Sequence, residues 1–263
     1  MRHDPAEMPL AGCGVLVTRA AHQAAGLIEA VEQAGGEAIR FPVIEIQGRD
    51  PEILRRERDA LPAPDIVVYT SPNAVRYAFD PGSDSGALVA AVGPATETAL
   101  RSRGRTVDIR SPGGFDSEHL LAEAALGEVT GKIVRIVRGD RGRELLATTL
   151  AERGATVDYL SVYRRLPARH TDEELLELER LWRAGRVHVV TVMSVESLDN
   201  LLTSLPAHCR DALPATPLVT PSKRVIQTAA DRIPAVRTVL APGPLPADVL
   251  SAVIACRSEH RND

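Results

Sequence analysis

Short runs of aliphatic and β-branched residues alternate along this chain with segments in which apolar residues recur every three or four positions. The runs are typical of strands in a parallel sheet covered on both faces, and the periodic segments are typical of the covering helices. We therefore predict an α/β protein. Ten strands are predicted, over residues 14–18, 37–41, 66–70, 88–92, 106–109, 133–137, 156–160, 188–193, 217–219 and 236–240.

Helical periodicity fills the intervals between these runs. Leu27, Ile28, Val31 and Ala34 share one helical face, as do Leu145, Leu146, Thr149 and Leu150. The polar segment 172–184 places Leu175, Leu178, Leu181 and Trp182 on a buried stripe. Further helices are predicted after Ser71, Gly93, Ser117, Ser194, Pro221 and Pro246, whereas residues 206–214 are predicted to be a surface loop.

The pattern occurs twice, in nested order. Residues 15–45 and residues 133–163 both indicate strand, helix, strand, and their closing glycines, Gly36 and Gly154, lie 118 residues apart. The segment 67–100 is matched in the same way by 189–229. The repeats predict two similar five-strand domains, the first discontinuous (residues 1–43 and 167–263) and the second continuous (residues 48–160).

Two segments connect the predicted domains. Residues 41–47 leave the first domain and residues 159–166 return to it. Two extended segments that cross side by side can pair as a ribbon, so we predict a two-stranded β hinge. A ligand cleft between the two halves is the expected consequence.

Composition excludes several classes of protein. The 31 Lys and Arg against 35 Asp and Glu give a net charge of −4 with no basic tail, so no nucleic-acid partner is expected. No apolar run approaches the ~20 residues that span a bilayer, and residues 1–12 lack an apolar signal stretch. We expect a cytoplasmic protein without a membrane partner.

The cysteines and histidines indicate no metal site. Cys13, Cys209 and Cys256 are odd in number and widely separated, which favours reduced thiols in the core. The seven histidines show no HxxxH spacing, and no CxxC occurs. Neither a metal nor a cofactor is expected.

Four predicted strands are followed by residues that start helices. Ser71 can cap a helix in which Pro72 is the first residue. Two interpretations remain open: an ordinary cap, or a helix start whose free N–H groups bind a carboxylate at the carboxyl ends of the strands. The same geometry is expected at Ser194, with variants at Gly93 and at Pro221-Ser222.

Arg19 and Arg138 follow equivalent strands of the two repeats, and Gly139 permits a tight turn after Arg138. They are either solvent-exposed arginines or a symmetric pair that binds carboxylates through bidentate hydrogen bonds. Tyr163 ends the returning hinge segment. It is either a packing residue or a general acid that reaches the cleft. No GxxxxGK[ST], GxSxG or HExxH motif occurs.

Together these segments resemble the uroporphyrinogen-III synthase family. The resemblance is carried in order by VLVTR (15–19), GGEAIRFPVIEI (35–46), VVYTSPNAV (67–75), AVGPATETAL (91–100), DSEHLL (116–121), RGDRGRELL (138–146), VYRR (162–165) and MSVESLDNL (193–201). It implies two flavodoxin-like domains joined by a β ribbon, no metal and no cofactor. It also implies conversion of hydroxymethylbilane to uroporphyrinogen III, with loss of water and inversion of ring D.

The same resemblance assigns residues. A tyrosine matching Tyr163 assists departure of the substrate hydroxyl, and the matched cleft residues are Ser71, Asn73, Thr96, Arg138 and Ser194. A Gly-Pro-x-Thr-like turn of many members is replaced here by residues 220–223, where Ser222 or Lys223 substitutes. The alternative interpretation is a non-catalytic two-lobed protein that binds or senses a small molecule. In either case we expect a monomer.

Overall fold

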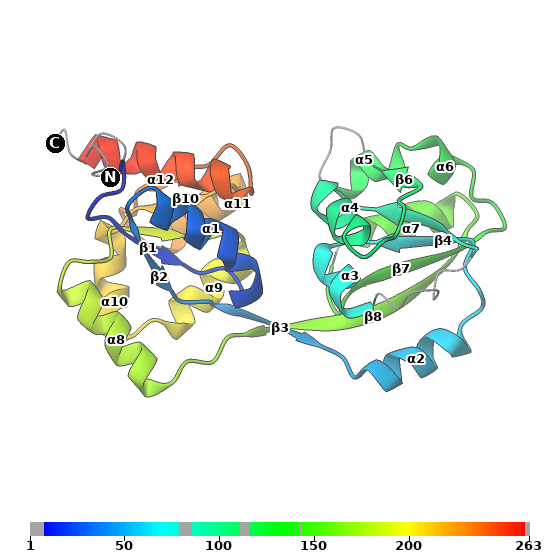
Figure 1. Ribbon diagram of the computed structural model, residues 1–263, viewed down its shortest axis with the longest axis horizontal. Helices are drawn as coiled ribbons and strands as arrows, with labels where there is room; N and C mark the ends of the chain where they lie inside the picture. Colours follow the sequence, from blue (N-terminus) through cyan, green and yellow to red (C-terminus); the bar gives the residue numbers. More distant parts are fainter. Residues whose placement is uncertain (1–7, 79–85, 111–115, 143, 261–263) are drawn as a thin grey trace. The chain divides into compact units, whose positions relative to one another are not determined.

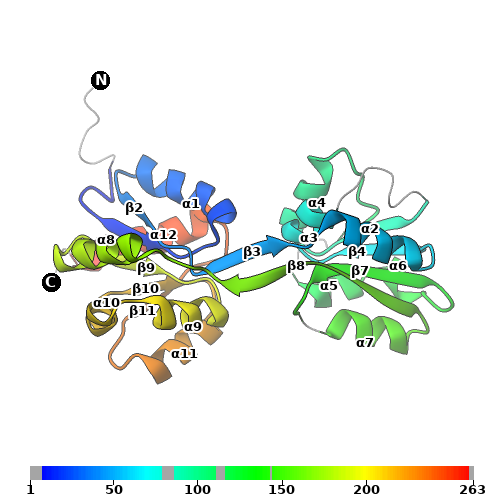
Figure 2. The same cartoon turned by 90° about the horizontal axis from the view of Figure 1, so that it is seen from below.

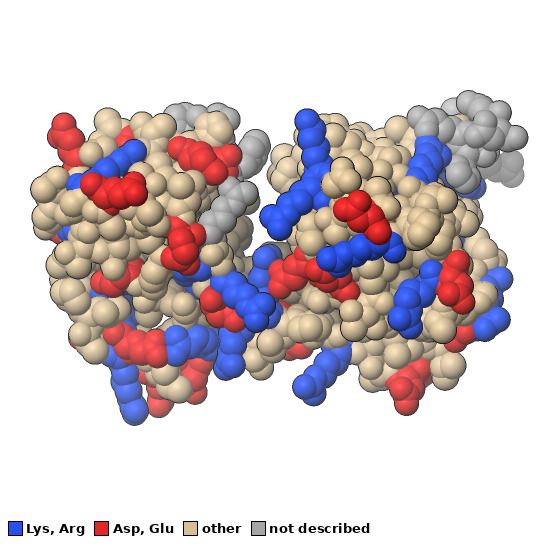
Figure 3. Space-filling model, turned by 180° about the vertical axis from the view of Figure 1, so that it is seen from behind, with Lys and Arg blue, Asp and Glu red and all other residues tan. Residues whose placement is uncertain are grey.

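The computed structural model describes residues 8–78, 86–110, 116–142 and 144–260. The chain divides into two compact units, each described by itself: unit 1 comprises residues 1–45 and 166–263, and unit 2 comprises residues 46–165. Figure 1 labels their elements. Basic and acidic side chains are interspersed on the displayed face of each unit (Figure 3).

Unit 1 is built on a five-stranded sheet of order β11-β10-β9-β1-β2 in which all neighbours are parallel. Helices α1 and α12 cover one face of this sheet, and α8, α9, α10 and α11 lie on the other (Figure 2). The strands are β1 Gly14–Val17, β2 Glu37–Arg40, β9 Val189–Thr191, β10 Leu218–Thr220 and β11 Thr238–Leu240. The helices are α1 Ala21–Gln33, α8 Asp172–Arg183, α9 Val195–Ser204, α10 Ala207–Ala212, α11 Lys223–Arg232 and α12 Pro246–His260, with the 3-10 turn η2 Leu213–Ala215.

Burial on both faces explains why β1, in the middle of the unit 1 sheet, is apolar throughout. Val15 and Val17 pack in the cluster that contains Leu27 and Val253, on the α1 and α12 side. Leu16 is fully buried and points to the opposite face, because successive strand residues alternate. Truncating a fully buried residue such as Leu27 to alanine costs about 2–5 kcal/mol of stability.

Unit 2 contains a six-stranded sheet of order β3-β8-β7-β4-β5-β6. Leaving β3 aside, its spatial order matches that of unit 1 when β7 and β8 are placed on β1 and β2, although here they come last in the sequence. The nested repeat is thus two copies of one sheet with different chain order. The strands are β3 Ile44–Gly48, β4 Ile66–Tyr69, β5 Leu88–Ala91, β6 Ile109–Arg110, β7 Ile133–Gly139 and β8 Thr156–Pro167. The helices are α2 Pro51–Ala60, α3 Pro72–Ala78, α4 Pro94–Arg101, α5 Ser117–Leu121, α6 Ala124–Gly127 and α7 Leu145–Glu152.

The two connecting segments pair with each other, as predicted: β3 and β8 are hydrogen-bonded neighbours. The N–H of Arg49 donates to the carbonyl of Val162 at 3.0 Å, and the N–H of Ala168 donates to the carbonyl of Val43 at 3.2 Å. Residue 49 is thus opposite residue 162 and residue 43 is opposite residue 168, so the two segments run in opposite directions and the pair is antiparallel. The other strand pairs of unit 2 are parallel.

An arginine in the buried strand β7 is explained by its neighbour on β8. Arg135 lies opposite Asp158, and its Nε donates to the carboxylate at 2.7 Å. Its Nη2 also donates to the carbonyl of Pro62 at 2.7 Å. The guanidinium is therefore paired and hydrogen-bonded, the condition under which a charge is tolerated in a protein interior.

The structure corrects two predictions of secondary structure and adds one helix. Residues 206–214 contain helix α10, with Cys209 buried, because Pro206 precedes the helix and Pro214 follows it. The strand predicted at 106–109 is shortened to β6, which begins at Ile109. Before it, the side-chain carboxylate of Asp108, and not a main-chain carbonyl, accepts the N–H of Val89 of β5 at 2.8 Å, so the main-chain ladder does not extend further. Helix α2, which no periodicity predicted, starts at Pro51 with Asp50 as its cap.

Candidate active site

Unit 2 has a pocket of about 270 Å³ at the carboxyl ends of β4 and β7. These strands are parallel neighbours, so the segments that follow them share one edge of the sheet. We call this cavity the Arg138 pocket. It is lined by Thr70, Ser71, Ser117, Ile136, Arg138, Gly139, Arg141, Gly142, Leu146, Tyr159, Tyr163 and Arg165.

A bulge places Tyr163 in this pocket. The β7–β8 register pairs Arg138 with Ser161 but Gly139 with Tyr163, so Val162 is an extra residue in β8. Bulges re-aim side chains in this way beside active sites. Tyr163 is 7% exposed, and its ring lies so close to Gly139 that a Cβ added there would be 2.7 Å from Cε2. Gly139 is thus required by the tyrosine ring rather than by a turn.

The hydroxyl of Tyr163 lies 3.2 Å from Oγ of Ser71. The same Oγ accepts the N–H of Ala74 at 3.1 Å. The capping role predicted for Ser71 is therefore confirmed, and the cap oxygen also contacts the phenol. If Ser71 donates its hydroxyl proton to the phenol oxygen, the phenol proton is left for a ligand in the pocket.

Arg138 is buried rather than solvent-exposed, at 9% exposure. Its Nη1 donates to Glu144 at 3.0 Å, its Nε donates to the carbonyl of Gly139 at 3.3 Å, and its guanidinium lies 4.9 Å from the centroid of the Tyr159 ring. The Tyr159 hydroxyl donates to the second oxygen of Glu144. These hydrogen bonds from Tyr159 and Arg138 lower the pKa of the Glu144 carboxyl. Arg138 thus binds a carboxylate, but one that the protein supplies.

Arg19, the counterpart of Arg138, lies in unit 1. It is half-buried, and its Nη1 donates to the carbonyl of Pro244 at 3.3 Å. Burial lowers the pKa of its guanidinium. As a partly desolvated cation, Arg19 would gain from an anionic ligand.

The predicted helix starts are confirmed as caps. In unit 1, Oγ of Ser194 accepts the N–H of Ser197 at 3.1 Å and Oγ of Ser222 accepts the N–H of Val225 at 3.4 Å. In unit 2, Gly93 precedes α4 with a φ of 77°, a conformation that favours glycine.

Not all of the predicted site residues line the Arg138 pocket. It brings together Ser71, Arg138, Gly139 and Tyr163. Asn73 and Thr96 are buried at 4% and 1% exposure elsewhere in unit 2, and Gly93 also lies outside the lining. Arg19, Ser194 and Ser222 belong to unit 1.

Sequence reasoning missed two cations of the pocket, Arg141 and Arg165. The signal for Arg165 was present, because it lies two residues after Tyr163 in β8 and strand side chains repeat with period two. The sequence indicates Ser117 only as a helix start and Tyr159 only as part of the hinge. With Arg138, three arginines line the pocket, which suits a ligand with several carboxylates.

Among the described residues, no group of three His, Cys, Asp or Glu side chains is arranged to hold a metal ion. Within the same residues, no helix is long and apolar enough to cross a membrane. Cys13, Cys209 and Cys256 are free thiols buried in the core, as predicted.

Comparison with known proteins gives one consistent match. The family model described as "Uroporphyrinogen-III synthase HemD" matches residues 25–238. The chain is 32% identical to the uroporphyrinogen-III synthase of Proteus mirabilis, over 72% of this chain and 98% of that protein. It is also 32% identical to the enzyme of that name from Salmonella typhimurium, over 75% of this chain and 82% of that protein.

Solved structures share the fold. A uroporphyrinogen-III synthetase from Helicobacter pylori matches with a TM-score of 0.60 at 13% identity, covering 92% of this chain and 99% of that one. A mutant uroporphyrinogen III synthase from Thermus thermophilus matches with a TM-score of 0.58 at 20% identity, covering 94% and 99%.

Proposed function

The chain belongs to the uroporphyrinogen-III synthase family, hydro-lyases of tetrapyrrole biosynthesis, and we propose that its substrate is hydroxymethylbilane, held by carboxylates in the Arg138 pocket. The product is uroporphyrinogen III, formed with inversion of ring D and release of water. The observation that carries the proposal is the approach of Tyr163 to Ser71 beside three arginines in one pocket.

Tyr163 acts as the general acid in this proposal. Its phenol donates its proton to the substrate hydroxyl as the carbon–oxygen bond breaks, and water departs. Ser71 donates a hydrogen bond to the phenol oxygen and so stabilises the phenolate, while the N–H of Ala74 fixes the position of Oγ. The proton lost from ring D when the macrocycle closes restores the phenol. The overall reaction releases one water, changes no oxidation state and forms no covalent intermediate with the protein.

Arg138 binds a substrate carboxylate by exchanging it for Glu144. The Glu144 side chain is 64% exposed, so its departure into water costs little. Arg141 and Arg165 line the same cavity and supply further positive charge. Hydroxymethylbilane cyclises unaided to the symmetric isomer, so the protein must fix the chain in one arrangement faster than that route proceeds. Orientation of bound groups is a sufficient source of such acceleration.

The test is product analysis with enzymatically generated hydroxymethylbilane, separating isomers I and III by chromatography. Tyr163→Phe should slow formation of isomer III by about 10²–10⁴-fold, the usual range for a general acid, unless water substitutes in part. Tyr77→Phe is the matched control, since its hydroxyl donates to the Ile46 carbonyl at 3.0 Å and does not line the Arg138 pocket. An unchanged rate in Tyr163→Phe removes this residue from the mechanism.

A further inference from the structure

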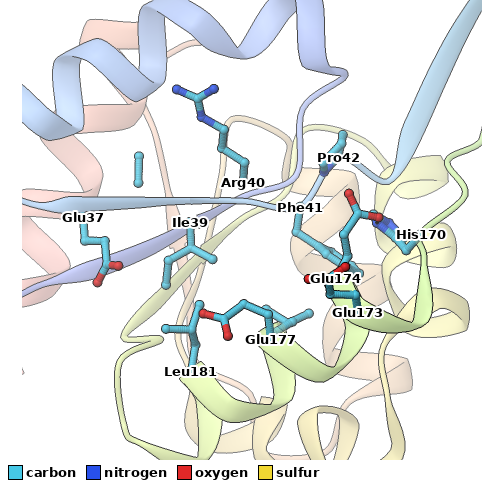
Figure 4. Close-up of a pocket in the computed structure, with 12 residues that line it drawn as sticks. Glu37, Ile39, Arg40, Phe41, Pro42, His170, Glu173, Glu174, Glu177 and Leu181 are labelled. Atoms are coloured by element: carbon cyan, nitrogen blue, oxygen red, sulfur yellow. The ribbon is translucent and has the colours of Figure 1, made fainter.

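Unit 1 contains a groove of about 470 Å³ between β2 and α8 (Figure 4). Six consecutive residues, from Glu37 to Pro42, form one wall. Glu37 and Ile39 point towards α8, whereas Arg40 points away from it (Figure 4). Because Arg40 still borders the groove, it does so through its main chain. The cavity, which we call the β2 groove, therefore follows the open edge of the strand.

The edge of β2 is a row of main-chain groups. Among the described strands, β2 is the last in its sheet and pairs only with β1. The N–H groups of Glu37 and Phe41 donate to β1-side carbonyls, at 2.8 and 3.0 Å. Since donors alternate in direction along a strand, the N–H groups of Ala38 and Arg40 face the groove. Such an edge is a template for another strand.

In unit 2, β8 has the place in the sheet that β2 has in unit 1, next to the strand matching β1. The part of β8 that corresponds to β2 is residues 156–159, which pair with residues 133–136 of β7. Strand β3 pairs antiparallel with β8 only beyond that part, from Val162 onwards. An antiparallel strand is thus added to a sheet of this type in unit 2, although not along the stretch that corresponds to β2.

The opposite wall of the groove, formed by α8, is acidic and favours a positively charged ligand. Glu173, Glu174 and Glu177 of α8 line the groove together with Leu178 and Leu181, which are 3% and 8% exposed. With Glu37 on the strand side, four carboxylates border an apolar floor. This wall would repel a polycarboxylate, so the β2 groove is unsuited to the substrate proposed for the Arg138 pocket.

Two of these carboxylates have exchangeable partners. Glu37 is paired with Arg186 at 2.6 Å and Glu177 with Arg180 at 2.7 Å. Both pairs are exposed, and such pairs contribute little to stability, so an incoming cation can replace either arginine. At the end of the groove the ring of His170 stacks on Phe41, with its Nε2 buried and unbonded among the described residues.

We propose that the β2 groove binds an extended segment of a partner protein in which apolar residues alternate with lysine or arginine. The segment adds antiparallel to β2 as a further strand of unit 1. Its main chain bonds to the outward groups of Ala38 and Arg40. Its cations share the face of the added strand that is turned to α8, so their methylene stems contact the apolar floor while their charged ends replace Arg180 and Arg186. Strand addition of this kind draws affinity from main-chain hydrogen bonds and specificity from alternate side chains.

The test uses the full chain and a fluorescent acetylated and amidated peptide, KVKVKVK, with EVEVEVE as the charge control. Anisotropy should show saturable binding of the lysine peptide only. Amide exchange measured by NMR should slow at Ala38 and Arg40 on binding, while Glu37 and Phe41, already bonded, serve as internal controls. Binding without protection at Ala38 and Arg40 would mean that the groove holds a cation through side chains alone, and would overturn the proposal.

Three variants and one altered peptide separate strand addition from charge attraction. Ala38→Pro removes an outward N–H and should weaken binding at least about tenfold, whereas Ala38→Val keeps it and should not. Glu173→Gln should weaken binding at low salt by severalfold. KVKVKVK methylated on every backbone nitrogen keeps its charges but cannot donate main-chain hydrogen bonds. It therefore tests the hydrogen bonds between the added strand and β2 without altering the protein. Equal affinity for the methylated and unmethylated peptides would refute the proposal.

Discussion

The ring of Tyr163 lies directly against Gly139, with the space for a Cβ already occupied by Cε2 and Cζ at 2.7 and 2.8 Å. The Tyr163 ring can take this position only because Gly139 has no side chain. The extra residue Val162 in β8 brings the tyrosine to this place, and the absence of a side chain at position 139 lets the phenol reach Ser71.

Gly139→Ala should displace the Tyr163 ring and lower both stability and activity. Overpacking of this kind costs typically about 1–3 kcal/mol, measured as the loss in free energy of unfolding in urea. Gly127→Ala is the control, because nothing lies within 4 Å of its added Cβ. In a Tyr163→Ala background the alanine at 139 should cost much less. An equal cost in both backgrounds would show that the ring is not the obstacle.

Ser71→Ala should act on stability and on turnover by separate routes. Loss of the cap costs about 0.5–2 kcal/mol. Thr171→Ala, which removes the cap of α8, should cost a similar amount without slowing turnover. The kinetic effect of Ser71→Ala should largely vanish in a Tyr163→Phe background, because the two hydroxyls act as one unit. Additive kinetic effects in this double-mutant cycle would contradict the coupling.

Glu144→Gln should lower KM severalfold with little change in kcat. The carboxylate of Glu144 occupies Arg138 in the free protein, so removing its charge makes the guanidinium more available to a substrate carboxylate. Glu152→Gln, on the exposed side of α7, is the matched control. A raised KM would instead mean that Glu144 holds Arg138 in its binding position.

Stability should fall between pH 9 and pH 11 in part through Cys209. Burial, with a smaller effect from Glu179, raises the pKa of this thiol from 9.0 to about 11. Over that window the unfolded thiol ionises while the folded one stays protonated, so the unfolded state binds fewer protons and the free energy of unfolding falls, by on the order of 2 kcal/mol. This contribution is fully present below pH 9.

The measurement is urea unfolding at pH 8 and pH 11. The free energy of unfolding should fall less between the two pH values in Cys209→Ala than in the unmodified chain, because the variant has no thiol to ionise. The packing cost of the alanine is the same at both pH values and cancels in this difference. The same pH dependence in both proteins would show that Cys209 makes no contribution.

The sequence alone determined the features that depend on neighbours in the chain. Alternation and helical periodicity located the strands of both sheets, because burial on both faces leaves β1 and β4 apolar throughout. The caps at Ser71, Ser194 and Ser222 were predictable because each hydroxyl bonds an N–H only three residues away. The nested repeat likewise followed from order and spacing.

Only the tertiary structure decided which of these residues meet. Ser71 and Tyr163 are 92 residues apart, and their contact depends on strand order and on one extra residue in β8, which periodicity does not encode. The partners of Arg138 were hidden for the same reason: Glu144 and Tyr159 reach it from a helix start and a neighbouring strand. Periodicity gives the face on which a side chain lies, but register and bulges determine which side chains it meets there.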